Sequence, residues 1–165
     1  MQKSKSEFYS LVQDIVDNKK FNKLADELHH GISRYEHSMR VAKWTYKIGK
    51  KFNIDKLNET TRAALLHDFY TNEDLKGNSG LKNLKVHPNQ ALDNSMKYFN
   101  LDEVQKDIIK THMFPCTLNL PKYKESWLVS GVDKLAGLYE MVRYKLSLYL
   151  GIYLLFLFNL LTIPR

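Results

Sequence analysis

Disulfides and thiolate metal clusters are excluded by the cysteine content of this chain of 165 residues. Cys116 is the only cysteine, so no intrachain disulfide can form and a zinc site built from several thiolates is impossible. Helix-breaking residues are also scarce, since the chain has only four prolines and seven glycines. Neither β-type alternation nor an internal repeat is visible. The sequence therefore predicts a single all-α domain in a reducing compartment.

An apolar stretch near the N-terminus is missing as well, so no signal peptide is expected. Acidic residues are fewer than basic ones, so the net charge is +7 and the pI is about 9.3. A basic chain favours anionic partners, which include phosphorylated small molecules, nucleic acid and an anionic membrane face. The lysines are scattered rather than gathered in a stripe, which favours a phosphorylated small molecule over a nucleic acid polymer.

Apolar residues recur at helical spacing over most of the chain. Phe8, Leu11, Val12 and Ile15 form one such set, and Phe21, Leu24 and Leu28 form a second, which Gly31 should end. Further helices are expected from about Ser33 to Phe52, from Asn58 to His67, from Pro88 onward, after Asp102, and from about Glu125. Ser33 with Glu36 has the pattern of a capping box, and Asp102 is a suitable N-cap. Residues 71–86 and the segment between Pro115 and Pro121 are predicted loops.

Two ligand-type residues, His67 and Asp68, directly follow the apolar run Ala63 to Leu66. Core packing does not explain this pair. His37 lies four residues before Val41, His112 four after Ile108, and Asp133 four after Val129, so all three should face inward. Each histidine alone is better explained as a hydrogen-bonded core residue. Burying a carboxylate without a partner is costly, however, so the whole set favours a metal site.

The expected metal is a divalent transition ion. Imidazole together with carboxylate suits Fe, Mn, Zn, Ni or Co. Four side chains would complete one site, namely His37, His67, Asp68 and Asp133. Asp68 has two oxygens and could bridge to a second ion held by His87 and His112. Two ions about 3.5–4 Å apart can clamp a phosphoryl group, so we expect two ions.

At this point the sequence resembles the HD-domain superfamily of metal-dependent phosphohydrolases, over roughly Gly31 to Glu140. The segments that carry the resemblance are RYEHSMRVA, AALLHDFY, HPNQAL, IIKTHMFP and VSGVDKLAGLYE. It implies an all-α HD-domain helical bundle. The extra His87 and His112 are similar to the binuclear branch, which includes HD-type dinucleoside-tetraphosphate hydrolases. The implied activity is hydrolysis of a phosphoester or phosphoanhydride in a nucleotide-like substrate. The alternatives are a one-metal nucleotidase and a non-catalytic, nucleotide-binding membrane sensor.

Other residues are expected to assist His67 and Asp68 at the catalytic centre. Glu73 is a candidate general acid for the leaving group. Arg40 follows His37 by three residues and could reach a phosphate, although a surface salt bridge explains it equally well. Lys122 and Lys124 could receive an anionic substrate, although a solvated pair of charges is the simpler explanation.

The C-terminal part has no charge over the 18 residues from Leu146 to Ile163. This is about the minimum length of a membrane span. We therefore predict an HD phosphohydrolase domain over 1–145 and a transmembrane anchor over 146–163. Arg143 and Lys145 would place the domain on the cytoplasmic face. Asn159 suggests a hydrogen-bonded helix partner, and thus homo-oligomers. The alternative is a terminal helix that packs on protein.

Overall fold

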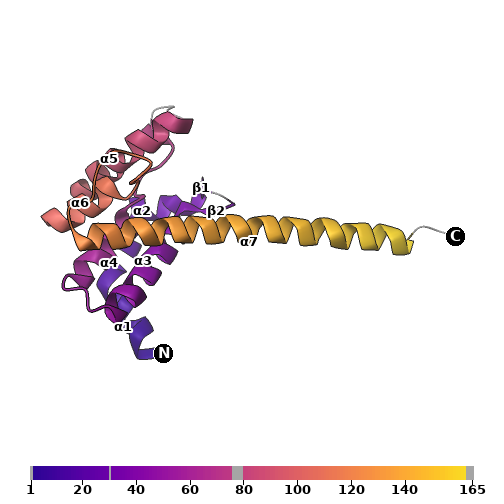
Figure 1. Cartoon of the computed structure of the whole chain (residues 1–165), viewed down its shortest axis with the longest axis horizontal. Helices are drawn as coiled ribbons and strands as arrows, with labels where there is room; N and C mark the ends of the chain where they lie inside the picture. The colour runs from indigo at the N-terminus through magenta and orange to yellow at the C-terminus, as the bar shows by residue number, and fades with distance from the viewer. Residues whose placement is uncertain (1, 30, 76–79, 163–165) are drawn as a thin grey trace.

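The computed structural model describes residues 2–29, 31–75 and 80–162 and is helical almost throughout (Figure 1). The predicted all-α fold is confirmed. The α-helices are α1 (Gln2–Val16), α2 (Lys19–Asn22), α3 (Arg34–Lys51), α4 (Leu57–Leu66), α5 (Gly80–Tyr98), α6 (Glu103–Thr111) and α7 (Lys124–Thr162). Two short 3-10 helices are η1 (Lys23–Asp26) and η2 (Glu73–Leu75), and a small hairpin consists of β1 (Leu28–His29) and β2 (Ile32–Ser33).

Two helices begin at the caps that the sequence predicts. The Ser33 hydroxyl accepts the backbone N–H of Glu36 at 3.2 Å, and the Glu36 carboxylate accepts the N–H of Ser33 at 3.3 Å. Asp102 and Gln105 form the same reciprocal pair at 2.8 and 3.0 Å at the start of α6. Both capping boxes satisfy backbone donors that would otherwise lack a partner at a helix start. The capping of α3 matters for the site, because α3 carries His37.

The second predicted helix is only partly present. Asn18 caps α2 by accepting the backbone N–H groups of Lys20 and Phe21, and η1 follows directly. The chain then forms the β1–β2 hairpin, in which Leu28 pairs with Ser33. Gly31 has a φ of +87° there, a conformation that glycine adopts without strain. The helical spacing of Phe21, Leu24 and Leu28 was therefore misleading at its C-terminal end.

The prediction of a loop over residues 71–86 is wrong for its last part. Helix α5 begins at Gly80, and Pro88, predicted in its first turn, lies inside it. Residues 76–79 lie outside the described residues. The stretch from Gly80 to Val86 is rich in polar side chains, but Val86 packs against the core and His87 is buried. This inward face is enough to hold the segment as a helix.

The core lies where α3, α4, α6 and the first half of α7 pack together. Helix α4 is central, since the residues from Ala63 to Leu66 are all fully buried. Helix α5 packs against α6 on one side of this bundle, and α1 covers α4 on another. The ends of α3, α4 and α6 meet α7, and this meeting point positions the polar side chains described below.

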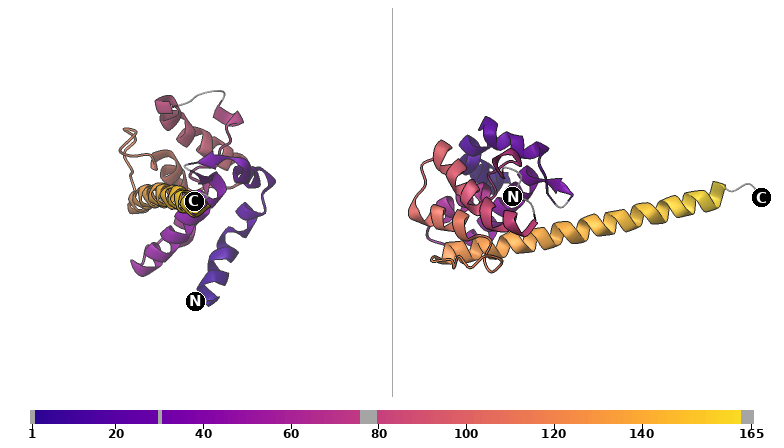
Figure 2. Two further views of the ribbon diagram at one scale, coloured as in Figure 1. Left: turned by 90° about the vertical axis from the view of Figure 1, so that its right-hand side faces the viewer. Right: turned by 90° about the horizontal axis from the view of Figure 1, so that it is seen from above.

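The second half of α7 leaves the bundle. The helix extends as a single rod to one side in two views (Figures 1 and 2). The ring of Tyr144 lies against Gly31 of the hairpin, whereas every described side chain from Lys145 onward is exposed. Among the residues that the structure describes, no helix combines the length and apolarity needed to cross a membrane. The predicted anchor over 146–163 is thus not supported, and its last residue, Ile163, lies outside the described residues.

Candidate metal centre

The His67–Asp68 pair lies at the C-terminal end of α4. The buried run before it fixes this end in the core, and His67 and Asp68 are 0% and 4% exposed. The helix ends there, because the N–H of Phe69 bonds back to Leu66 and that of Tyr70 to Asp68, at 3.0 and 2.8 Å. Both ligand-type side chains are therefore held in the interior by the backbone turn that follows them.

A first set of ligand atoms joins three helices. Nε2 of His37, on α3, lies 3.0 Å from Oδ1 of Asp133, on α7. Nε2 of His67 lies 3.5 Å from the same oxygen. These three side chains, which we call the His37 group, have donor atoms close enough together to surround one metal ion.

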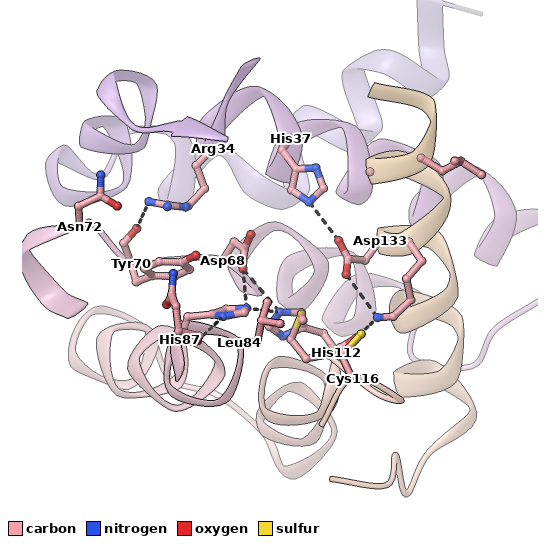
Figure 3. Close-up of a pocket in the computed structure, with 15 residues that line it drawn as sticks. Arg34, His37, Asp68, Tyr70, Asn72, Leu84, His87, His112, Cys116 and Asp133 are labelled. Atoms are coloured by element: carbon pink, nitrogen blue, oxygen red, sulfur yellow. Dashed lines mark hydrogen bonds and ion pairs between the residues drawn. The ribbon is translucent and has the colours of Figure 1, made fainter. Parts of the chain in front are cut away.

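A second set lies around Asp68. Nε2 of His87 and Nε2 of His112 are each 3.5 Å from Oδ1 of Asp68 and 3.0 Å from one another. Nε2 of His67 lies 3.8 Å from Oδ2 of Asp68. His67, Asp68 and His112 have donor atoms that could hold one ion, with His87 in contact with both Asp68 and His112. We call these four residues the Asp68 group. All six side chains predicted as metal ligands are thus brought together. Figure 3 labels five of them, namely His37, Asp68, His87, His112 and Asp133.

Each of the four histidines is oriented by its other ring nitrogen. Nδ1 of His67, His87 and His112 donates to the backbone carbonyls of Ala64, Asn83 and Ile109 at 2.7, 2.9 and 2.7 Å, respectively. Nδ1 of His37 donates to the Glu140 carboxylate at 2.9 Å. Hydrogen bonds of this kind fix the tautomer and leave Nε2 available for a metal.

Two buried atoms at the centre have no hydrogen-bond partner among the described residues, namely Nε2 of His67 and Oδ1 of Asp68. Their neighbours lie at 3.5 Å or more, which is beyond an ordinary hydrogen bond. A buried polar atom without a partner is costly, and a carboxylate oxygen is more so. The donor set therefore fits divalent transition ions, which His37, His67, Asp68, His87, His112 and Asp133 would hold.

The pKa values of the ligands differ between the two groups. Burial alone would lower the pKa of His37, but hydrogen bonds to Asp133 and Glu140 outweigh it and raise the value to about 10. Burial lowers the pKa of His87 to about 4, since the attraction of Asp68 is too weak to compensate. The neighbouring imidazoles hold the pKa of both Asp68 and Asp133 well below the usual range, against the opposing effect of burial.

Glu140 contacts a candidate ligand and was not predicted from the sequence. It is 3% exposed and joins His37 to Arg40, which donates to the same carboxylate. The signal in the sequence was its position seven residues after Asp133, which places it on the same face of α7. Arg40, predicted to bind substrate, is therefore engaged in holding Glu140 and does not line the pocket at the ligands.

Three other predicted residues lie away from this pocket. The ammonium group of Lys124 pairs with Asp55 at 2.5 Å, and the backbone N–H of Lys122 bonds to Asp107 at 3.0 Å. Both lysine side chains are exposed. Glu73 lies in η2 with its side chain exposed to solvent. None of the three residues lines the pocket, so the structure gives no support to the expected substrate-binding and general-acid roles.

Five of the six ligands, all except His67, line a pocket of about 470 Å³, the size of a typical small-molecule site (Figure 3). Its wall includes polar side chains that the sequence analysis did not single out: Arg34, Tyr70, Asn72, Asn83 and Lys134. The ammonium group of Lys134 donates to the hydroxyl of Ser130 at 3.1 Å and to the carbonyl of His112. The remaining wall is partly apolar and includes Leu84 and Leu138.

The chain matches the HD domain family over residues 34–138, which is most of its length. It therefore belongs to the HD domain family, and the match covers all six ligand residues. Members of this family are generally metal-dependent hydrolases that bind divalent ions, and many act on phosphate compounds. No curated protein and no solved structure shows significant similarity to the chain.

Proposed function

We propose that this protein is a phosphohydrolase that uses two divalent transition ions to cleave a phosphoester or phosphoanhydride in a nucleotide-like small molecule. The observation that carries the proposal is the convergence of six ligand side chains, five of them buried, with each imidazole oriented by a hydrogen bond at Nδ1. A binding module has no need of so complete a set. This argument favours an enzyme over a non-catalytic nucleotide sensor.

Divalent ions bound in such a site activate water and neutralise the charge of a phosphoryl group. The chain itself supplies the geometry. Glu140 and the three backbone carbonyls keep the imidazoles pointed at the centre. Lys134 lines the pocket beside Asp133, and its ammonium group is fixed by two acceptors. A positive charge held there would stabilise negative charge that develops on the phosphoryl group in the transition state.

The proposal is tested by elemental analysis of anaerobically purified protein, followed by a screen for phosphate release from nucleotides and dinucleotides. We expect about two ions per chain and turnover of at least one nucleotide-like compound, as for other two-metal sites. One ion per chain with full turnover would instead favour a one-metal nucleotidase that uses His37, His67, Asp68 and Asp133. A protein that holds metal but cleaves none of these compounds would favour the sensor.

The proposed substrate is a small molecule rather than a nucleic acid polymer. Its support is the pocket, whose volume of about 470 Å³ suits a small molecule, and the scatter of lysines over the chain. Binding to duplex DNA or RNA with a steep dependence on salt would contradict it, because proteins that track phosphates release counterions.

A further inference from the structure

Arg34 is a buried arginine at the wall of the metal-ligand pocket. It is the first residue of α3 and is 3% exposed. Its Nη1 donates to the backbone carbonyl of Tyr70 at 2.9 Å and to the Glu27 carboxylate at 3.5 Å. Its guanidinium group also lies over the Tyr70 ring, 4.0 Å from the ring centre. These contacts hold the guanidinium in one place.

One donor of this fixed group has no assigned role. Nε of Arg34 is buried and has no hydrogen-bond partner among the described residues. Arg34 nevertheless lines the pocket, as does Asn83, whose buried Oδ1 also lacks a partner in the described part of the chain. An unpaired donor on a buried cation is costly, so its presence at a pocket wall indicates a ligand that supplies the missing acceptor.

The charges around the pocket favour an anion as that ligand. Among the described lining residues the only carboxylates are Asp68 and Asp133, both of them metal ligands. Apart from the ligand histidines, the cationic side chains of the described wall are Arg34 and Lys134. Lys134 already donates to Ser130 and to the carbonyl of His112, whereas Arg34 keeps a donor unused. Guanidinium groups bind phosphate oxygens strongly and with fixed geometry.

The position of Arg34 separates it from the centre of the metal ligands. In Figure 3, Arg34 lies with Tyr70 and Asn72 on one side of Asp68, and Asp133 lies on the opposite side. A phosphoryl group held among the metal ligands would therefore leave Arg34 free for a different group of the same molecule. The pocket, at about 470 Å³, has room for both.

We propose that the guanidinium group of Arg34 binds a second anionic group of the substrate, next to the phosphoryl group that is attacked. This proposal rests on the proposed function and narrows its substrate class to compounds with at least two linked phosphate groups. Arg34 is then a substrate-binding residue, in place of the Arg40, Lys122 and Lys124 expected from the sequence.

The test compares the binding of inorganic pyrophosphate and inorganic phosphate to manganese-loaded protein by calorimetry. Arg34→Lys keeps the charge but removes Nε, and it should weaken pyrophosphate binding about tenfold or more, as expected for a lost charge-assisted hydrogen bond. Phosphate binding should change less than about twofold, since one phosphate can be held by the metal ligands alone. The metal content should stay at the wild-type value.

Arg62→Lys is the matched control. Arg62 also donates to a backbone carbonyl and to a carboxylate, those of Leu11 and Asp14, but it does not line the pocket. The Arg62→Lys substitution should leave the binding of phosphate and pyrophosphate unchanged. Glu27→Gln provides a second test should Arg34→Lys fail to fold. It removes the carboxylate that balances the guanidinium charge, so pyrophosphate should bind severalfold more tightly.

Unchanged pyrophosphate binding in Arg34→Lys would overturn the proposal, and so would an equal loss for phosphate and pyrophosphate. If Arg34→Lys does not fold, unchanged binding in Glu27→Gln would overturn it. These outcomes are distinct from failure of the proposed function. The wild-type protein could hydrolyse none of the compounds while Arg34→Lys still weakens pyrophosphate binding. That result would support the anion site and refute the assignment as an enzyme.

Discussion

The two sets of metal ligands meet at His67 but are built differently. In the His37 group, one imidazole is held between two carboxylates, since both ring nitrogens of His37 bond to acid side chains, Asp133 and Glu140. In the Asp68 group, a single carboxylate faces three imidazoles. A proton on His37 satisfies both carboxylates that it contacts. The carboxylate of the Asp68 group has no such proton, because its Oδ1 has no hydrogen-bond partner among the described residues.

This difference indicates which group depends more on a metal ion. A proton on His37 can balance the acids of the His37 group, as the raised pKa of His37 indicates. In the Asp68 group, His87 has a lowered pKa of about 4 and is neutral at physiological pH. Two of its imidazole nitrogens, on His87 and His112, lie only 3.0 Å apart. Imidazoles that converge on a buried carboxylate are typical of a site that requires a cation.

The largest effect should come from Asp68→Ala, which removes the carboxylate at the centre of the Asp68 group. We expect metal content to fall sharply and phosphate release to drop to background, while circular dichroism shows the helices largely retained. Elemental analysis and a phosphate assay measure both. Full activity in this variant would contradict the assignment as a metal-dependent enzyme.

A smaller effect should come from Glu140→Gln, which changes the partner of His37 and leaves the Asp68 group intact. Loss of such an outer partner typically costs about 10–100-fold in metal affinity or activity. We expect metal affinity or turnover to fall within that range, as measured by competition with a chelator and by kinetics. Glu125→Gln is the matched control, since Glu125 is also buried on α7, at 5% exposure against 3% for Glu140. If both variants lowered metal affinity or turnover equally, Glu140 would have no specific role in orienting His37.

The pKa difference between the groups predicts proton release on metal binding. His37, with its pKa raised to about 10, carries a proton at pH 7 in the metal-free protein, and a metal must displace it. The affinity of this group for metal should therefore rise with pH from 7 towards 10. His87, with its pKa lowered to about 4, releases none in this range. Calorimetry in two buffers of different ionisation enthalpy should give about one proton or more per chain, because Asp68 and Asp133 also raise the pKa of His67. A value near zero would contradict the comparison.

The smallest effect on activity should come from ending the chain after Tyr144. The described side chains beyond Tyr144 are exposed, and the ligands all lie before it. We expect turnover and metal content to remain at the wild-type values. A marked loss would show that the exposed half of α7 supports the site, for instance through a second copy of the chain.

Fractionation of the full chain tests the expected placement at the cytoplasmic face of a membrane.

The inward direction of three predicted ligands, His37, His112 and Asp133, could be predicted from the sequence because each lies four residues from an apolar residue. His37 with Val41, and Asp133 with Val129, show an inward direction without knowledge of the fold. The two capping boxes were also predictable, since they depend on residues three positions apart. These features are local, and the structure bears them out.

The partners of the charged residues could not be predicted, since they depend on segments far apart in the chain. Arg40 meets Glu140, and Lys124 meets Asp55, through the packing of α7 on the bundle. The burial of Arg34 depends on Tyr70 and Glu27, which the hairpin and the end of α4 bring to it. Residues 80–86 are helical because of tertiary contacts rather than their polar composition.

The number of metal ions in His112→Ala, compared with the wild type, tests the central claim most directly. His112 belongs to the Asp68 group alone, so its loss should spare the His37 group. We predict about two ions per chain in the wild type and about one in His112→Ala, with most of the turnover lost. An unchanged stoichiometry with unchanged turnover would contradict the two-metal account.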